Sequence, residues 1–271
     1  MKRVLSIQDL SCLGKCSLTV ALPILSVMGL SAGALPTAVM STHTAFPESV
    51  CRSFTGELVS IGEHWKKIGA EFDGISVGYL SDPQQARQVA QVIELFPAVT
   101  VIDPAMGDHG KLYSGMGPEN VQAMAMLCRR GDYLLPNLTE AALLTGIPYR
   151  EVPDEEYLDR LLSGLMDFGA KGVVITGIDW DIETTGFVGC YKDGNKFSYH
   201  TRRIPRRSHG TGDMFCAVTM GALTLGKSLE QAAALAAEFV ERVLMSTPQT
   251  TPFGANFEEV LPWLAGKLAN C

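Results

Sequence analysis

Ser208-His209-Gly210-Thr211-Gly212-Asp213-Met214-Phe215 places two glycines and an acid at the start of an apolar run. The run predicts a helix over 212–225. Glycine has no Cβ, so the backbone here can approach a ligand closely. Free N–H groups in a first helical turn, together with the helix macrodipole, bind anions. The segment therefore predicts an anion site formed by the backbone of Gly210, Thr211 and Gly212.

Asp213 falls in the first turn of this predicted helix. One interpretation is a capping carboxylate, with Gly212 as the turn residue. The other is a catalytic base, because a carboxylate beside an anion site can accept the proton of an alcohol that attacks phosphorus. Phosphoryl transfer depends mainly on positioning and charge neutralisation, so a weak base is sufficient. The segment taken alone leaves both interpretations open.

The rest of the chain alternates between predicted strands and helices. This order predicts an α/β fold, a three-layer sandwich with a mostly parallel central sheet, helices on both faces and an antiparallel hairpin at one edge. No linker or repeat interrupts it, so we expect one domain over 1–271. The expected strands cover 3–8, 34–40, 74–79, 99–103, 133–135 and 173–176, with the hairpin at 186–191 and 196–202. The expected helices cover 16–28, 61–70, 82–96, 119–130, 138–145, 154–168, 212–225 and 228–245.

Ligands of such folds bind beyond the carboxyl ends of the parallel strands. The polar segments expected at that end are Gln8-Asp9, 42–47, 79–82, 103–108 and 136–140. A polyphosphate needs a divalent cation, which prefers carboxylate and water oxygens. Asp103, Asp108 and Glu140 are the candidate ligands. Each of them alone is more typical of a surface or capping acid.

Composition excludes several classes of function. The net charge of −7 and the absence of a basic stripe argue against a nucleic-acid partner. Seven cysteines, an odd number without a CxxC pair, indicate reduced thiols and a cytoplasmic protein. The uncharged run from Cys16 to Pro47 is divided by prolines and glycines, which favours a buried helix and strand over a membrane span.

The segment from Gly221 to Ser228 matches the P-loop pattern of nucleotide-binding proteins. Its variable positions, however, suit the last turn of a helix better than an open loop. Gly226 is typical of a helix end, and Ser228 with Gln231 forms the pattern of a capping box. We therefore predict a junction between two helices here.

Together these motifs resemble the pyridoxal/pyridoxamine kinase family of the ribokinase-like superfamily. The resemblance implies ATP-dependent phosphorylation of the 5′-hydroxymethyl group of a vitamin B6 compound (pyridoxal, pyridoxamine or pyridoxine), with ATP and Mg²⁺, in a homodimer. It spans most of the chain, in family order. The matching segments are Ser6-Ile7-Gln8, Met40-Ser41-Thr42-His43-Thr44, Gly78-Tyr79-Leu80, Asp103-Pro104-Ala105-Met106-Gly107, Pro136-Asn137-Leu138-Thr139-Glu140 and Gly210-Thr211-Gly212-Asp213.

The resemblance also implies roles for individual residues. Asp213 is the base, and Gly210, Thr211 and Gly212 form the anion hole. The pyridine ring is expected against Thr44 and Tyr79, with His43 beside them, and 107–117 is expected to be a flap. The nucleotide side comprises Asn137, Glu140 and Thr176, and the magnesium region comprises Asp103, Asp108 and Glu140.

Two departures from the family pattern affect the substrate and the metal. Asp9 replaces a serine that contacts the ring in many members. We hypothesise that it pairs with a protonated ring nitrogen or with the amine of pyridoxamine. Leu135 stands where some members have a threonine that helps to hold a potassium ion, so activation by K⁺ stays open.

Two other functions remain as alternatives. A hydroxymethylpyrimidine kinase of thiamine synthesis shares the fold and several motifs, although it normally has a cysteine in place of Asp213 and a Gly-Ser-Asp start. A non-catalytic vitamin B6-binding protein is the second alternative, which an intact Asp213 and anion site disfavour.

Overall fold

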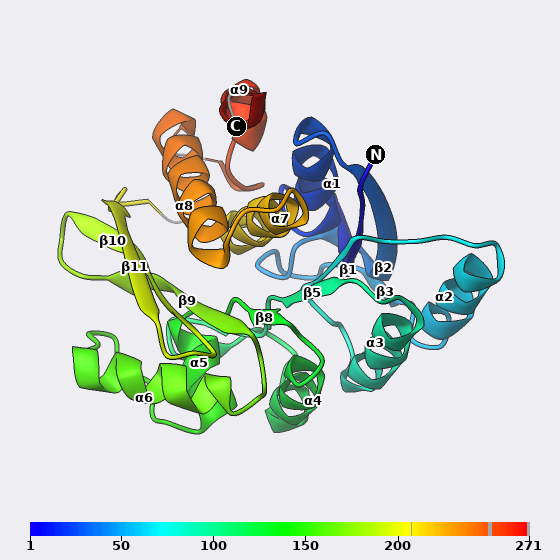
Figure 1. Ribbon diagram of the computed structural model, residues 1–271, viewed down its shortest axis with the longest axis horizontal. Helices are drawn as coiled ribbons and strands as arrows, with labels where there is room; N and C mark the ends of the chain where they lie inside the picture. Colours follow the sequence, from blue (N-terminus) through cyan, green and yellow to red (C-terminus); the bar gives the residue numbers. More distant parts are fainter. Residues whose placement is uncertain (207, 249–250, 270–271) are drawn as a thin grey trace.

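A single nine-stranded sheet runs through the part of the chain that the computed structural model describes, residues 1–206, 208–248 and 251–269 (Figure 1). Its strand order is β11-β10-β9-β8-β5-β4-β1-β2-β3. The strands are β1 (Arg3–Leu13), β2 (Ser31–Thr42), β3 (Cys51–Ser53), β4 (Gly74–Val77), β5 (Val99–Ile102), β8 (Tyr133–Leu134), β9 (Gly172–Asp179), β10 (Thr184–Tyr191) and β11 (Lys196–Arg202).

The direction of the strands agrees with the sequence prediction. The six from β2 to β9 in the sheet pair in parallel, and β10 and β11 add an antiparallel hairpin at one edge. A short antiparallel strand, β3, closes the other edge and was not predicted. A separate small hairpin, β6 (Gly107–Asp108) with β7 (Lys111–Leu112), lies within the predicted flap.

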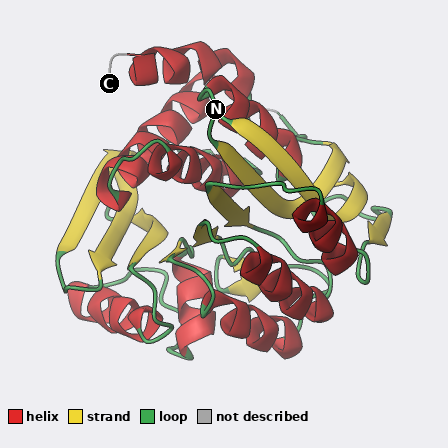
Figure 2. Ribbon diagram, turned by 45° about the vertical axis from the view of Figure 1, so that its right-hand side comes forward, coloured by secondary structure: helices red, strands yellow, loops and turns green. Residues whose placement is uncertain are grey.

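Helices cover both faces of the sheet, so the predicted three-layer sandwich is confirmed (Figures 1 and 2). One apolar core lies beneath α1, α7, α8 and α9, and a second lies beneath α2 to α6. The short helix η1 (Phe257–Val260) and α9 were not predicted. The helices are α1 (Leu18–Val27), α2 (Leu58–Lys67), α3 (Pro83–Leu95), α4 (Pro118–Cys128), α5 (Leu138–Thr145), α6 (Glu155–Met166), α7 (Thr211–Thr224), α8 (Leu229–Ser246) and α9 (Leu261–Ala269).

Local sequence signals place the helix ends. The carboxylate of Asp82 accepts a hydrogen bond from the Gln84 N–H at 2.8 Å, which caps α3 as expected. Ser228 and Gln231 form the predicted capping box of α8. Gly226 adopts a φ of 97° after the end of α7. The P-loop-like segment is therefore a helix–helix junction.

The first strand is longer than predicted. We expected it to end at residue 8, with Gln8 and Asp9 in the following loop, but β1 continues to Leu13, and β2 has one extra residue between the pairs Gln8↔Pro36 and Leu10↔Val39. Both polar side chains are buried and have partners within the strand. Gln8 Nε2 donates to Ser6 Oγ at 2.9 Å, and Asp9 Oδ2 accepts from Ser11 Oγ at 2.9 Å. Because both side chains find hydrogen-bond partners inside the protein, they can stay buried and the strand can continue past them.

The order of the sheet positions the site. Strand β1 lies between β2 and β4. After β1 the chain first adds β2 and β3 on one side, and then adds β4 and the later strands on the other side. A crevice forms where the chain reverses its direction of winding, beyond the carboxyl ends of the strands. Separately, none of the helices in the described residues is long and apolar enough to cross a membrane.

Candidate active site

The N-terminus of α7 is open at its first turn. Gly210 is the N-cap with φ 86° and ψ 0°, a left-handed conformation that glycine adopts readily. The helix begins at Thr211, and Asp213 is its third residue. Because Gly210 occupies the N-cap, the interpretation of Asp213 as the capping residue is wrong. The N–H groups of a first turn have no intrahelical acceptor and can bind an anion.

Gly210 is pressed against the loop that follows β1. A Cβ added at Gly210 would lie 2.0 Å from the Lys15 carbonyl oxygen, so no other residue fits without moving the backbone. A Cβ at Gly254 would lie 2.9 Å from that same oxygen and 3.2 Å from the His209 carbonyl oxygen. Three segments distant in sequence therefore meet in backbone contact at the start of α7.

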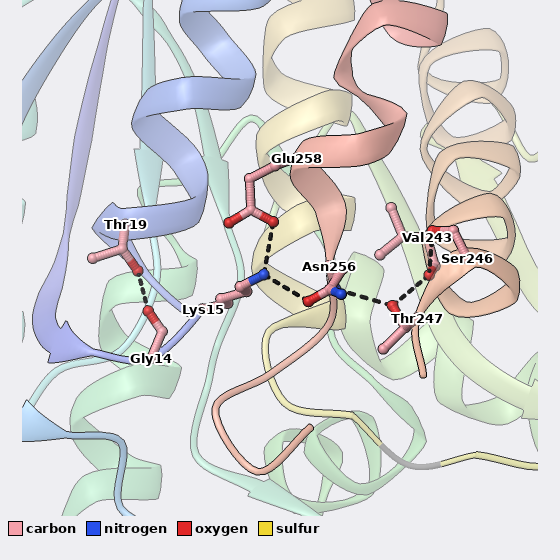
Figure 3. Close-up of polar contacts among 8 residues, drawn as sticks. All are labelled: Gly14, Lys15, Thr19, Val243, Ser246, Thr247, Asn256 and Glu258. Atoms are coloured by element: carbon pink, nitrogen blue, oxygen red, sulfur yellow. Dashed lines mark hydrogen bonds and ion pairs between the residues drawn. The ribbon is translucent and has the colours of Figure 1, made fainter. Parts of the chain in front are cut away.

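Lys15 holds this junction together from the side (Figure 3). Its Nζ donates to Asn256 Oδ1 and to Glu258 Oε2, both at 2.8 Å, and its backbone N–H donates to the Phe253 carbonyl at 2.6 Å. The Asn256 N–H in turn donates to Thr247 Oγ1 at 2.9 Å. Sequence analysis did not identify Lys15, because its partners lie more than 200 positions away.

Gly212 has the opposite environment. It is exposed, and the nearest atom to a Cβ added there would be Asp103 Oδ2 at 3.7 Å. Asp103 directly follows β5 and is only 8% exposed. The open side of the first turn of α7 thus faces a buried carboxylate at the end of β5.

Three acids, Asp103, Glu140 and Asp213, crowd negative charge at this point. Burial raises the pKa of Asp213 to about 7, against the effect of a hydrogen bond from the Ser17 backbone N–H. The pKa of Asp103 is raised well above its usual range by burial, and then by the charges of Glu140 and Asp213. Burial also raises the pKa of Glu140 to about 8. A cation would relieve this repulsion.

Glu140 is tied to the base of the predicted flap. Its carboxylate accepts from the Asn137 N–H at 2.9 Å and from the Met106 N–H at 3.0 Å. Asn137 Nδ2 donates to the Gly107 carbonyl at 2.8 Å. Thr176 forms a parallel bridge with Asn137, so the three residues expected on the nucleotide side do lie together.

Asp108, the remaining candidate metal ligand, is exposed and lies 3.4 Å from His109 Nε2. In residues 1–206, 208–248 and 251–269 there is no preformed cluster of three or more histidine, cysteine, aspartate or glutamate side chains that could hold a metal ion. A shared site for Asp103, Asp108 and Glu140 therefore stays a prediction.

Beside the turn that precedes α7, His43 belongs to a group of rings packed against one another at tilted angles. It lies 4.1 Å from the His209 ring and 4.8 Å from the Phe46 ring, centroid to centroid. Its Nε2 is 3.2 Å from the Pro252 carbonyl oxygen, whereas its buried Nδ1 has no hydrogen-bond partner among the described residues. Buried polar atoms are usually paired, so Nδ1 is available to a ligand.

The other residues expected around the substrate ring come from neighbouring segments. Burial, followed by the charge of Asp9, raises the pKa of the Tyr79 phenol to about 12. Thr44 is partly exposed in the turn after His43. Burial raises the pKa of Asp9, and its interaction with His43 lowers it, so Asp9 interacts electrostatically with both His43 and Tyr79. Asp9 itself is 3% exposed and bonded within the protein.

This sheet, with an anion site and a carboxylate at the start of α7, defines a kinase of the ribokinase-like superfamily. The family model described as phosphomethylpyrimidine kinase matches residues 36–258. The chain belongs to this family, and within it to the pyridoxal kinases.

Individual relatives agree with this assignment. The chain is 30% identical to a pyridoxine/pyridoxal/pyridoxamine kinase of Bordetella avium, over 90% of this chain and 85% of the relative. It resembles the pyridoxal kinase of Lactobacillus plantarum with a TM-score of 0.92 and 31% identity, covering 100% and 99% of the two chains. A Bacteroides thetaiotaomicron protein assigned to the phosphomethylpyrimidine kinases, in a crystal form with pyridoxal, is 34% identical with a TM-score of 0.92, covering 97% and 95%.

The two glycines at the start of α7 should respond differently to alanine. Gly210→Ala should lower the free energy of unfolding by more than about 1–2 kcal/mol, because the left-handed φ alone costs that much and the contact with Lys15 is lost. Gly212→Ala should leave stability within about 1 kcal/mol, since its φ is helical and the space is open. Urea unfolding measures both. Equal stabilities would contradict the packing described for Gly210.

The raised pKa of Asp213 predicts a pH-dependent stability difference. A carboxyl whose pKa rises from 3.8 to about 7 on folding costs the folded state stability progressively between these two pH values, because there only the unfolded state has released the proton. Asp213→Asn should therefore match the wild type below about pH 4, gain on it steadily as pH rises to about 7, and show a constant advantage above that, measured by thermal unfolding. The exposed Asp181 is the control. Its pKa is lowered, chiefly by the Glu183 N–H, so Asp181→Asn should not gain stability with pH.

Proposed function

We propose that the chain is a kinase that transfers the γ-phosphoryl group of ATP to the 5′-hydroxymethyl group of a vitamin B6 compound: pyridoxal, pyridoxamine or pyridoxine. One observation carries the proposal. Asp213 lies in the same helical turn as the amides of Thr211 and Gly212, and the open side of that turn faces Asp103. The names of the relatives in Bordetella and Lactobacillus support the choice of substrate.

The chemistry asks little of the protein beyond position and charge. The substrate hydroxyl donates its proton to the Asp213 carboxylate as its oxygen attacks the γ-phosphorus. The bond from that phosphorus to the bridging oxygen breaks, and ADP leaves. Meanwhile the N–H groups at the start of α7 stabilise the charge on the equatorial oxygens. The pKa of about 7 suits this role, because the carboxyl is then ionised near neutral pH and still basic.

The acids around Asp103 fit a divalent cation. Asp103 is buried without a cationic partner, and its pKa is raised partly by neighbouring negative charge, which Mg²⁺ would neutralise. Asp103, Asp108 and Glu140 would hold the ion, in part through water, and bound Mg²⁺ would neutralise the ATP phosphates. Asn137 and Thr176 would border the nucleotide. The potassium ion, the homodimer, the single domain over 1–271 and the cytoplasmic location remain predictions from the sequence.

The packed rings around His43 suit an aromatic substrate. His43 offers an Nδ1 without a partner among the described residues, next to the ring of Phe46. An aromatic ring with polar substituents would match both the ring faces and this nitrogen. Placed there, the hydroxymethyl arm of the substrate would extend toward Asp213.

A second candidate function is phosphorylation of hydroxymethylpyrimidine, which the description of the family model favours. That substrate is also a hydroxymethyl group on a nitrogen heterocycle. Asp213, where that class normally has cysteine, favours the vitamin B6 compounds. ADP release measured with pyridoxal, pyridoxamine, pyridoxine and hydroxymethylpyrimidine separates the two candidates, and no turnover of any of them would favour a non-catalytic binding protein.

Replacing the base should abolish most of the turnover. Asp213→Asn removes the proton acceptor with almost no change of shape, so kcat should fall about 10²–10⁴-fold. Asp193→Asn, in an exposed hairpin turn, is the control and should leave kcat unchanged. An Asp213→Asn variant that retained its turnover would refute the role of Asp213.

A side chain on the open side of α7 should impair the use of ATP more than the binding of the vitamin substrate. Gly212→Ala places a methyl group near Asp103, where the phosphoryl oxygens would lie, so kcat/KM for ATP should fall at least about tenfold while the protein remains folded. Steady-state kinetics and equilibrium binding of the vitamin substrate measure the two effects. Unchanged kinetics with ATP would place the phosphate elsewhere.

A further inference from the structure

Ser17, immediately before α1, has an unusual backbone conformation. Its φ is 53° and its ψ is −131°, a region that glycine populates and other residues avoid. Among the described residues that are not glycine, only Ser17, Glu48 and His109 have a positive φ. Such a conformation costs about 1–3 kcal/mol and persists where surrounding contacts impose it, which is frequent at functional sites.

The side chain of Ser17 does not serve α1. A serine at this position normally accepts a hydrogen bond from the first turn of the helix, but Ser17 makes no such bond. Its hydroxyl instead donates to Asp9 Oδ1 at 2.5 Å. The other oxygen of Asp9 accepts from Ser11 at 2.9 Å. The hydroxyl of Ser17 is therefore committed to a buried carboxylate from β1.

Asp9 lies in β1 opposite a bulge of β2, where two residues of β2 face it between the pairs Gln8↔Pro36 and Leu10↔Val39. Bulges redirect side chains and are frequent beside active sites. Hydrogen bonds to an ionised carboxylate are stronger than those between neutral groups. Asp9 is thus able to hold Ser17 in a conformation that serine would not otherwise adopt.

The backbone of Ser17 is directed at the base. The Lys15 carbonyl and the Cys16 Cα lie 2.0 and 3.4 Å from a Cβ added at Gly210, so the chain reaches Ser17 directly beside the start of α7, and the Ser17 N–H lowers the pKa of Asp213. The Ser17 carbonyl accepts from the N–H groups of Val20 and Ala21 at the start of α1. The preceding residues are fixed as well, since the Lys15 carbonyl packs against Gly210 and Thr19 Oγ1 donates to the Cys16 carbonyl at 2.7 Å. The amide that contacts Asp213 is therefore held on both sides.

We propose that Asp9 and Ser17 are positioning residues: Asp9 fixes the backbone of Ser17, and the Ser17 N–H holds the Asp213 carboxylate where it can accept the proton of the substrate hydroxyl. The inference rests on the proposed function of Asp213 as the base. It gives Asp9 a role through Ser17, in place of a direct contact with a cationic substrate. Ser17 carries the effect by its backbone conformation, and its hydroxyl matters because it maintains that conformation.

Two substitutions of Ser17 separate this role from a merely structural one. Ser17→Ala removes the hydroxyl but keeps a Cβ that disfavours the positive φ, so kcat should fall roughly tenfold, the order of one charged hydrogen bond. The KM values for ATP and the vitamin should stay within about twofold, because neither substrate touches Ser17. Ser17→Gly also lacks the hydroxyl but adopts this φ freely, so it should recover at least about threefold of the lost kcat.

Two further variants complete the test. Asp9→Asn retains the shape but can no longer accept from both hydroxyls, and it should lower kcat as Ser17→Ala does. Ser11→Ala, which removes the other hydroxyl donor to Asp9, is the matched control and should change kcat by less than about twofold. Thermal unfolding of each variant checks that it is folded.

The outcomes distinguish the two proposals. A wild-type kcat in Ser17→Ala, or a Ser17→Gly variant no more active than Ser17→Ala, overturns the positioning role while Asp213→Asn remains inactive. Retained turnover in Asp213→Asn overturns the proposed base itself. A loss confined to the KM of the vitamin in Asp9→Asn would return Asp9 to direct substrate contact and also overturn the inference.

Discussion

The backbone contact between Gly210 and the Lys15 carbonyl is the constraint on which the site depends. An anion site at a helix N-terminus needs amides that are free of side chains and fixed in direction. Here the turn before α7 is fixed by contact with the loop after β1, and that loop is fixed by the segment from Phe253 to Glu258. The junction therefore fixes the three segments relative to one another.

The same junction explains why a carboxylate can remain buried there. Asp213 is surrounded by negative charge from Asp9 and Asp103, and burial raises its pKa. The amide of Ser17 opposes this effect from the start of α1. The N-termini of α1 and α7 thus meet at one acid, and their macrodipoles favour its charged form. An acid at this position is costly to ionise but titrates near neutral pH, which is the property that the proposed proton transfer requires.

Sequence alone was sufficient wherever the signal was local. The start of α7, the cap at Asp82, the capping box at Ser228 and the antiparallel hairpin each depend on residues within a few positions of one another. The contacts of Lys15 and the pairing of the edge strand β3 involve residues that only the fold brings close together. No local sequence pattern predicts them. The predicted end of β1 was wrong for a related reason. The polar side chain of Asp9 suggested an exposed loop, but in the structure it is buried and hydrogen-bonded within the protein.

Asp9 shows how a departure from a family pattern is best interpreted. An acid in place of a ring-contacting serine suggests a new charge for the substrate, if the position is considered alone. In the structure both of its oxygens accept hydroxyl hydrogen bonds, from Ser11 and Ser17, and one of these donors contacts the base through its own backbone. Desolvation of a carboxylate is expensive unless its hydrogen bonds are satisfied. Asp9 together with the two serines forms a satisfied buried unit, so the position is understood through its partners and through the backbone conformation that they impose on Ser17.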